Sequence, residues 1–373
     1  MNVSANVWLS ISANLWPRVR PGPALLVSAA AVLLAFVVGA ALIALMGVPV
    51  ADAVAAFADG AWGSPYALAA SINRALVLML VGLGFILAER ASLTNVGGEG
   101  QIAVGGIAAT ALALWSPVAA LPGGLAFIVP MLGACLAGAL WGGIAGVLKV
   151  KAGTNEVIAT LLLSFIAIWM VYGSVQSENL LRRPMTSSAT LPESLEIPAA
   201  TQLPLLTGDA SMPLHVGLLL GVLLAIAVAV VLNRTVLGVQ LRATGQNPRA
   251  ARRAGMAVDG LTIGVLCAAG AFGGLAGAFM LQGEQYSLKA GFSSGYGFDG
   301  LVVGLLARGS ATGVVAGSLL FGFLRSGGIN MEMVAQVPTA LVVVIQGLII
   351  VMLAGAALSI RRMEAERKMK VAG

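Results

Sequence analysis

The sequence predicts an all-α polytopic membrane protein with about ten transmembrane helices, some of them short or broken, and with both termini in the cytoplasm. Of the 373 residues, 59% are apolar and 10% are charged, whereas a soluble domain is about half apolar and a quarter charged. Apolar runs of roughly 20 residues, enough to cross a bilayer core, recur along the chain. Lys and Arg cluster in alternate connections between these runs. This composition excludes an ordinary cytosolic enzyme, a disordered chain and a nucleic-acid-binding protein.

The first span is expected at residues 24–46, a run without charge that is too long for the apolar core of a signal peptide. The later spans are expected at about 70–89, 100–116, 123–148, 156–175, 214–232, 260–281, 290–307, 311–326 and 335–359. The third and eighth of these are short, Gly-rich and bounded by polar residues, a pattern typical of broken or re-entrant helices. No stretch predicts a soluble domain.

The positions of Lys and Arg set the predicted orientation. With the N-terminus in the cytoplasm, the outside set contains only Arg182, Arg183, Lys289 and Arg325, while Arg74 lies near the outer end of the second span. All other basic residues fall inside. The predicted organisation is a cytoplasmic segment (1–23), a transmembrane domain (24–359) with an irregular external loop (176–213) and a cytoplasmic coupling loop (233–259), and a cytoplasmic tail (360–373).

Several kinds of chemistry are not expected of this chain. Cys135 and Cys267 lie in separate apolar runs, which excludes a disulfide framework. The lone histidine, His215, cannot build a His-rich metal site and is expected at an interface, so no metal or cofactor is predicted. No lysine follows a glycine, so a Walker A motif is absent. Transport driven by ATP would therefore need an ATPase on another chain.

Glycines at four-residue spacing predict closely packed helices. Small residues at this spacing let helix backbones approach each other in lipid. The series are Gly138, Gly142 and Gly146, together with the pairs Gly270–Gly274, Gly273–Gly277 and Gly313–Gly317.

Polar residues between the second and third spans mark a candidate helix break. The segment from Thr94 to Gln101 contains Asn95, Gly97, Gly98, Glu99 and Gln101, and its glycines favour an unwound backbone. An ionised carboxylate at bilayer depth costs about 2.5–3.5 kcal/mol, so Glu99 needs a partner, water or a shallow position. Helix capping and a structural or pathway role at the break both remain open.

A second polar cluster, Gly153–Glu156, opens the fifth span. Asn155 would cap the N-terminus of that helix, and the charge of Glu156 would favour its positive end. Capping and a pathway role are again the two alternatives.

The coupling loop contains a short predicted helix. Asn247 is an expected N-cap, Pro248 fits the first helical position, and Gly255 supplies a stop. Arg249, Arg252 and Arg253 share one face, whereas Ala250, Ala251 and Ala254 form a small, smooth face. Such a helix can lie across the membrane surface and dock into a groove of a partner; the alternative is a basic loop with incidental helicity.

Three stretches resemble the permease subunits of ABC importers, in the branch that serves simple sugars, nucleosides and branched-chain amino acids. The stretch from Leu83-Gly84 to Gln101 is similar to that family's "fNIGxEGQ" segment, and residues 153–158 are similar to its "GTNEVI". These two favour the nucleoside-type subgroup. The third stretch runs from Gly238 through 241–248 to Gly277. Arg249 stands where the older permease signature has Glu, while Ala250, Ala251 and Gly255 fit it.

The resemblance implies a permease in the bacterial inner membrane that moves a small polar solute, with a nucleoside or simple sugar favoured. It implies a second permease subunit, as a heterodimer, two separate ATPase subunits and an extracytoplasmic solute-binding protein. It implies docking of the ATPase on Asn247, Pro248, Ala250, Ala251, Arg252 and Gly255. The alternative is a secondary transporter driven by an ion gradient, with Glu99 and Glu156 as proton or cation sites. An intramembrane enzyme is not expected, because the sequence offers no His/Asp or Cys/His set of catalytic residues.

Overall fold

The computed structural model describes residues 23–122, 124–184, 191–338, 340–348, 351–352 and 355. Nearly all of the expected N-terminal segment (1–23) and the whole of the expected tail (360–373) lie outside the described residues. Within them the chain is all-α, with three isolated β-bridges as its only strand-like pairings. The chain divides into two units, residues 1–48 with 340–373, and residues 49–339.

The first unit contains α2 (Pro23–Leu45) and helical residues 340–348. Helix α2 carries no charged residue and coincides with the first expected span. Gly39 of α2 lies against the side chain of Ile345, since a Cβ atom at Gly39 would fall 2.8 Å from Ile345 Cδ1. The two helical segments of this unit therefore pack together.

The second unit holds the remaining helices. They are α3 (Val50–Trp62), α4 (Pro65–Arg90), α5 (Gly98–Ala113), α6 (Ser116–Ala119), α7 (Leu125–Ala152), α8 (Glu156–Gln176), η1 (Ala199–Thr201), α9 (Gly217–Arg234), α10 (Val236–Gln246), α11 (Pro248–Arg253), α12 (Val258–Met280), the π-helical turn η2 (Leu281–Gln285), α13 (Tyr296–Ala307) and α14 (Ala311–Ala335).

Six described helices are long and apolar enough to cross a membrane: α4, α7, α8, α9, α12 with η2, and α14. The third and eighth expected spans correspond to the short helices α5, of 16 residues, and α13, of 12 residues. Helix α3 was not predicted. Helix α14 begins where the ninth expected span begins but extends past residue 326 to Ala335, so Arg325 is followed by almost three further helical turns.

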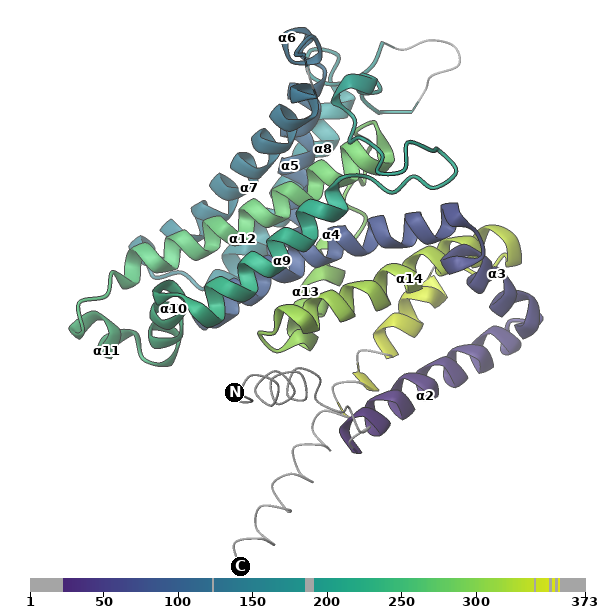
Figure 1. The fold of residues 1–373 in the computed structure, drawn as a ribbon, viewed down its shortest axis with the longest axis horizontal. Coiled ribbons are helices and arrows are strands. Elements are labelled where there is room, and N and C mark those ends of the chain that lie inside the picture. The colour runs from purple at the N-terminus through teal and green to yellow at the C-terminus, as the bar shows by residue number, and fades with distance from the viewer. Residues whose placement is uncertain are drawn as a thin grey trace, which may run out of the picture. The chain divides into compact units, whose positions relative to one another are not determined.

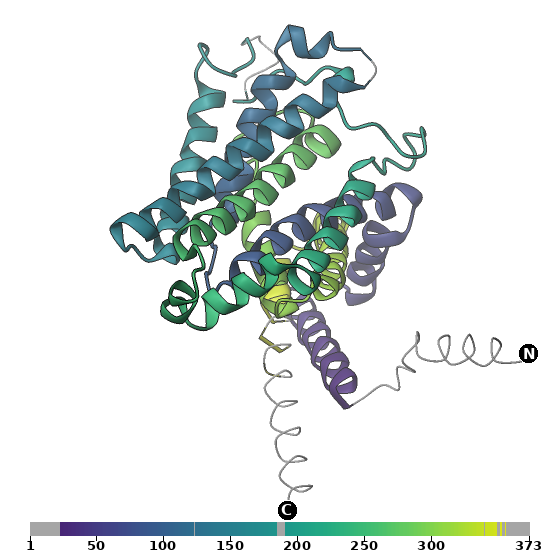
Figure 2. The same ribbon diagram turned by 60° about the vertical axis from the view of Figure 1, so that its left-hand side comes forward.

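Glycine contacts bring α7 and α12 together, and both views show the two helices side by side (Figures 1 and 2). A Cβ atom at Gly138 would collide with the carbonyl oxygen of Gly270, and one at Gly270 would collide with that of Gly138. A Cβ atom at Gly274 would collide with the Ala134 carbonyl oxygen of α7, and one at Gly105 of α5 would collide with the Gly274 carbonyl oxygen. The close packing predicted from the glycine spacing is confirmed here.

Helix α4 is the most buried of the long helices. In its most apolar stretch 89% of the residues are buried, against 28% for α7, α8 and α9. It packs against α14, α12, α13, α9 and α3. Because other helices surround α4 on almost every side, polar side chains along α4 can form hydrogen bonds and ion pairs with residues of those helices.

Helix α12 runs between the coupling loop at its N-terminal end and the π-helical turn η2 at its C-terminal end. The short helix α11 ends four residues before α12 begins, and the turn η2 directly follows the last residue of α12. Residues 191–216 pack on η2, where the Leu203 amide donates a 2.9 Å hydrogen bond to the Gln282 carbonyl. The coupling loop and the long polar loop thus lie at opposite ends of α12 (Figure 1).

Candidate functional site

The carboxylate of Glu99 fastens the start of α13 to the start of α5. Its Oε1 accepts a hydrogen bond from the Gly295 amide at 2.8 Å, and its Oε2 accepts one from the Gly297 amide at 2.7 Å. Glu99 is 3% exposed. Both amides belong to the N-terminal end of α13, where backbone donors lack partners within the helix. Glu99 is therefore satisfied by capping a helix other than its own.

Two positive helix ends surround this charge. Glu99 sits in the first turn of α5 and binds the N-terminus of α13, and each helix N-terminus favours a negative charge. The two helices are about 24 and 18 Å long at 1.5 Å per residue, shorter than the roughly 30 Å hydrocarbon core. The arrangement is that of short helices meeting within a membrane protein, where transport proteins build their binding sites.

The contact between the two short helices requires glycine. A Cβ atom at Gly297 would overlap the backbone of Glu99, and one at Gly98 would lie 2.9 Å from Val81 Cγ1 and 3.1 Å from the Gly297 carbonyl oxygen. Larger residues would push α13 away and break the hydrogen bonds to Glu99.

An amide pair closes the loop before α5. Asn95 Nδ2 donates to Gln101 Oε1 and Gln101 Nε2 donates to Asn95 Oδ1, both at 3.2 Å. Asn95 Oδ1 also accepts from the Gly97 amide at 3.0 Å. Both side chains are buried. The predicted break is therefore an ordered loop whose polar groups satisfy one another.

The second predicted cluster lies next to the first. The Glu156 carboxylate accepts hydrogen bonds from Lys149 Nζ at 2.6 Å and from the Thr94 amide at 3.5 Å. Asn155 Oδ1 accepts from the Val157 amide at 2.8 Å, so Asn155 caps α8. Further along α8, Thr160 and Ser164 accept hydrogen bonds from backbone amides of the 94–101 segment. The structure thus brings both predicted polar clusters together.

The coupling-loop residues form a separate group. Asn247 Oδ1 accepts from the Ala250 amide at 3.0 Å, and Pro248 is the first residue of α11. The helix ends where Gly255, at φ +83°, takes the left-handed conformation. The Gly255 and Met256 amides donate to the carbonyls of Arg252 and Ala251, each at 3.1 Å. This pair of bonds is a Schellman motif, so the expected cap, first residue and stop are confirmed.

The faces of α11 differ from the expectation at one position. Ala250, Arg252 and Ala254 are exposed, but Ala251 is buried at 3% exposure. One side of α11 packs against the rest of the permease chain, and Ala251, near the middle of the helix, lies on that side. The predicted smooth face of three alanines is therefore wrong, because Ala251 does not face outward.

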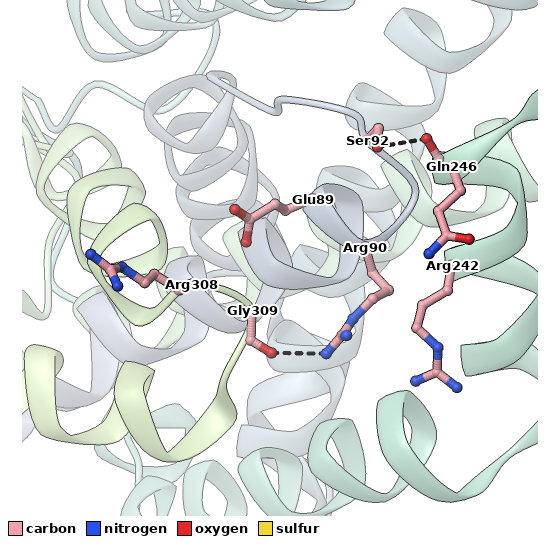
Figure 3. Close-up of a pocket in the computed structure, with 8 residues that line it drawn as sticks. Glu89, Arg90, Ser92, Arg242, Gln246, Arg308 and Gly309 are labelled. Atoms are coloured by element: carbon pink, nitrogen blue, oxygen red, sulfur yellow. Dashed lines mark hydrogen bonds between the residues drawn. The ribbon is translucent and has the colours of Figure 1, made fainter. Parts of the chain in front are cut away.

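A basic pocket of about 320 Å³ lies beside this loop (Figure 3). It is formed where α4, α10 and α13 end, and Arg90, Arg242 and Arg308 line it with Glu89 as the only acid. Arg90 Nη2 donates to the Gly309 carbonyl at 3.0 Å, and Arg242 Nη1 donates to the Leu232 carbonyl at 2.9 Å. Helix C-termini favour such cations.

A charged cluster that sequence reasoning missed lies toward the other end of α4. Arg74 binds Glu284 Oε1 through Nε at 3.0 Å and Nη2 at 2.8 Å. Arg325 binds Asp299 at 2.5 Å, and its guanidinium carbon lies 3.8 Å from the centre of the Tyr296 ring. The available signal was a set of ionisable residues within apolar runs, which marks functional sites in membranes.

These features define a multi-pass membrane transport protein, with short helices meeting at a buried polar junction and an accessory helix outside the long spans. In the described residues no three His, Cys, Asp or Glu side chains gather as a metal site would require. The sequence pattern of the family described as "Branched-chain amino acid transport system / permease component" matches residues 67–354. The chain belongs to this family.

Several relatives carry more specific names. The chain is 36% identical to a glucose ABC transporter permease protein of Haloferax volcanii over 86% of this chain and 85% of that protein. It is 33% identical to a guanosine ABC transporter permease protein of Bacillus subtilis, over 88% and 93% of the two chains. A nucleoside ABC transporter permease protein of Lactococcus lactis subsp. cremoris is 28% identical, over 58% and 59%. No solved structure matches.

The chain is therefore a permease subunit of an ATP-binding-cassette importer, a multi-pass protein of the bacterial inner membrane.

Proposed function

We propose that this permease moves a nucleoside or a simple sugar and that a separate ATPase subunit supplies the energy. The observation that carries the coupling proposal is α11, a helix of six residues closed by a side-chain cap at one end and a Schellman motif at the other. So short a helix is marginal in water unless its ends are satisfied. Helix α11 has both ends capped, lies outside the long apolar helices and exposes most of its residues, as a docking element for a partner protein must.

The solute proposal rests on the relatives. One is named for glucose and another for guanosine, and both align with most of this chain. These solutes share a neutral, hydroxyl-rich ring. The choice between nucleoside and sugar is the first thing for transport assays to decide.

The ATPase is proposed to contact the exposed side of α11. Ala250 supplies a small contact surface, Arg252 stands at its rim in an ion pair of 2.5 Å with Asp259, and Asn247, Pro248 and Gly255 hold the helix in shape. Ala251 anchors the helix to its own chain. The basic pocket, through Arg242 and Arg308, offers a neighbouring place for acidic side chains of the ATPase.

We further propose the remaining assembly. The permease spans the membrane about ten times with both termini in the cytoplasm, pairs with a second and different permease subunit, and receives its solute from an extracytoplasmic binding protein. The junction of Asn95, Gly97, Gly98, Glu99 and Gln101, with Asn155 and Glu156 beside it, holds the short helices around the solute path.

Reconstitution tests the energy source. Proteoliposomes that contain the permease pair, with or without the ATPase subunit, are filled with ATP at a constant concentration. The binding protein and radiolabelled guanosine or glucose are then added outside. We expect uptake that requires the ATPase and persists when ionophores collapse the ion gradients. Uptake without the ATPase that stops with the gradient would establish the secondary transporter instead.

Single cysteines test the orientation. In a chain with Cys135 and Cys267 replaced by Ala, a membrane-impermeant thiol reagent should label Ala200→Cys in intact spheroplasts and should leave Ala254→Cys unlabelled until the membrane is opened. Both positions are exposed. Labelling of Ala254→Cys in intact spheroplasts would reverse the proposed topology.

A further inference from the structure

A second cavity, of about 280 Å³, lies under the long polar loop and is here called the loop pocket. Its walls come from the first turns of α4, from residues 202–213 and from η2, and its polar lining residues are Tyr66, Asn73, Gln202, Glu284 and Tyr286. Neither the family pattern nor the relatives' names assign any residue here. A pocket of this size approaches the lower end of small-molecule sites.

Hydrogen bonds hold the walls in place without filling the pocket. Asn73 Nδ2 donates to the Pro213 carbonyl at 2.7 Å and ties α4 to the loop. The Leu203 amide donates to the Gln282 carbonyl at 2.9 Å and ties the loop to η2. The three walls are therefore connected to one another by the molecule's own contacts.

One buried acceptor in the pocket has no partner. Asn73 is 4% exposed, and its Oδ1 lacks a hydrogen bond, while its Nδ2 donates to the Pro213 carbonyl. A buried acceptor left unpaired is unfavourable, and such groups in native structures point to a water or ligand. The pocket thus offers an acceptor to any molecule that brings a hydroxyl donor.

The remaining lining groups match a neutral, hydroxylated ligand. The Glu284 carboxylate is charge-balanced by Arg74, at 2.8 Å, so the pocket presents an acceptor without net negative charge. Burial raises the pKa of the Tyr286 phenol, as do the neighbouring Tyr66 and the carboxylates of Glu284 and Glu196, so the phenol stays protonated at neutral pH. Tyrosine rings also offer flat apolar faces to the C–H groups of a sugar ring.

Glu284 belongs to a turn whose backbone departs from the regular α-helix next to the loop pocket. Residues Leu281–Gln285 form a π-helical turn at the end of α12. Single π turns inside α-helices occur mostly at functional sites. The turn places Gly283, Glu284 and Tyr286 on the same cavity, and Tyr286 takes the left-handed conformation at φ +55°.

We propose that the loop pocket binds the hydroxylated ring of the transported solute, a furanose or pyranose, with Asn73 and Glu284 accepting its hydroxyl protons. This proposal rests on the proposed function and adds to it the place where the permease itself recognises the solute. A neutral polyol is favoured over an anion because none of the described Lys, Arg or His residues lines the pocket to bind phosphate or carboxylate.

Cysteine protection tests binding directly. In the chain lacking Cys135 and Cys267, an Ala70→Cys variant places a thiol at the pocket lining, and a maleimide reagent labels it in membranes that contain the whole transporter. We expect guanosine or glucose to slow this labelling, and ribose 5-phosphate, an anionic probe, to leave it unchanged. A control thiol at Ala200→Cys, an exposed position of the loop that does not line the pocket, should show no protection.

Transport by filled-pocket variants provides the second readout. Ala70→Phe should raise the half-saturating solute concentration about tenfold, the size of one lost hydrogen bond or more, while Ala139→Phe, at a half-buried helical position away from the pocket, leaves it unchanged. Asn73→Asp, which keeps an acceptor but adds charge, should show the same direction of change.

The outcomes separate the two proposals. If guanosine or glucose is transported but neither protects Ala70→Cys, the loop pocket is not the solute site although the proposed function stands. Protection by the binding protein without solute would make the pocket a protein-docking cleft and would also overturn the proposal. If neither solute is transported, the proposed function itself fails.

Discussion

Glu99 and Gly297 are 198 residues apart in the sequence, yet Glu99 Oε2 accepts a 2.7 Å hydrogen bond from the Gly297 amide. The same carboxylate binds the Gly295 amide through its other oxygen. One buried side chain thus uses both of its oxygens to join α5 and α13, the helices that correspond to the two short expected spans. Neither helix is long enough to cross the bilayer core alone, so their junction must be held by contacts of this kind.

Glu99→Gln should destabilise the junction. Glutamine keeps one acceptor oxygen, but its amide group would face one of the two backbone donors, and an unpaired buried donor costs about 1–3 kcal/mol. Unfolding of the purified protein in detergent, followed by heat or denaturant, measures the change. Glu196→Gln, in the exposed part of the loop, is the control and should be neutral. Equal stability of both variants would show that the two hydrogen bonds contribute little, and normal transport by Glu99→Gln would exclude a role for the charge.

Gly297→Ala should separate α5 from α13. The added methyl would overlap the backbone of Glu99, and forced overpacking of this kind costs about 1–3 kcal/mol. Gly264→Ala is the matched control, because a Cβ atom there meets no atom within 4 Å, and it should be neutral or slightly stabilising in its helix. Yield of folded protein after size-exclusion chromatography and the unfolding midpoint report the difference. An unaffected Gly297→Ala protein would mean that the two helices can move apart freely.

Ala250→Trp should weaken binding of the ATPase while the membrane bundle stays folded. Ala250 is exposed on α11, so a large side chain blocks the surface that we propose for docking. Copurification of the ATPase with the tagged permease measures it, and uptake should fall in parallel. Ala251→Trp should instead lower the yield of folded permease, since Ala251 is buried. Arg252→Ala should change ATPase binding by about 1 kcal/mol or less, as exposed ion pairs do. Retention of full binding and transport by Ala250→Trp would remove α11 from the coupling role.

His215 should make stability fall in acid. The side chain is 1% exposed, lies just before α9, and accepts a 3.2 Å hydrogen bond from the Gly217 amide at Nδ1. Burial lowers the pKa of His215 to about 4. In the unfolded chain His215 takes up a proton as the pH falls below about 6.5, whereas in the folded chain it stays neutral until about pH 4. The free energy of unfolding is therefore highest above pH 6.5 and falls as the pH drops toward 4.

The decline should reach about 3 kcal/mol, at 1.36 kcal/mol for each unit of pKa difference. His215→Asn keeps an acceptor for Gly217 without a titrating ring, so the difference in unfolding free energy between the two proteins should shrink from pH 7.5 to pH 4.5. Parallel pH profiles for both proteins would contradict a buried neutral histidine.

Much of the fold is predictable from local patterns. Long apolar runs mark α4, α7, α8, α9 and α12, because bilayer thickness and helix rise set their length. Asn247 with Pro248, and Gly255 after them, predict the ends of α11, because caps and stops depend on the backbone within a few residues. The spacing of Gly138 and Gly270 predicts close packing, because small side chains are needed where two helices touch.

Other features depend on which helices become neighbours. The sequence shows that Glu99 needs a partner, but only the folded chain brings the Gly295–Gly297 amides to it. The sequence places Arg74 and Arg325 near the outer ends of two expected spans, but only the folded chain pairs them with Glu284 of η2 and Asp299 of α13. The inward turn of Ala251 likewise follows from the contact of α11 with its own chain.

By itself, then, the sequence determined that the protein is a helical membrane permease, where its long helices run, and which segments break or cap. Apolar length, glycine spacing and capping residues act over a few turns of one helix and can be read along the chain. The tertiary structure alone decided the partners of Glu99, Arg74 and Arg325, the burial of Ala251 and the loop pocket around Asn73. Those depend on hydrogen bonds and charge pairs between residues far apart in sequence, which exist only once the helices have packed.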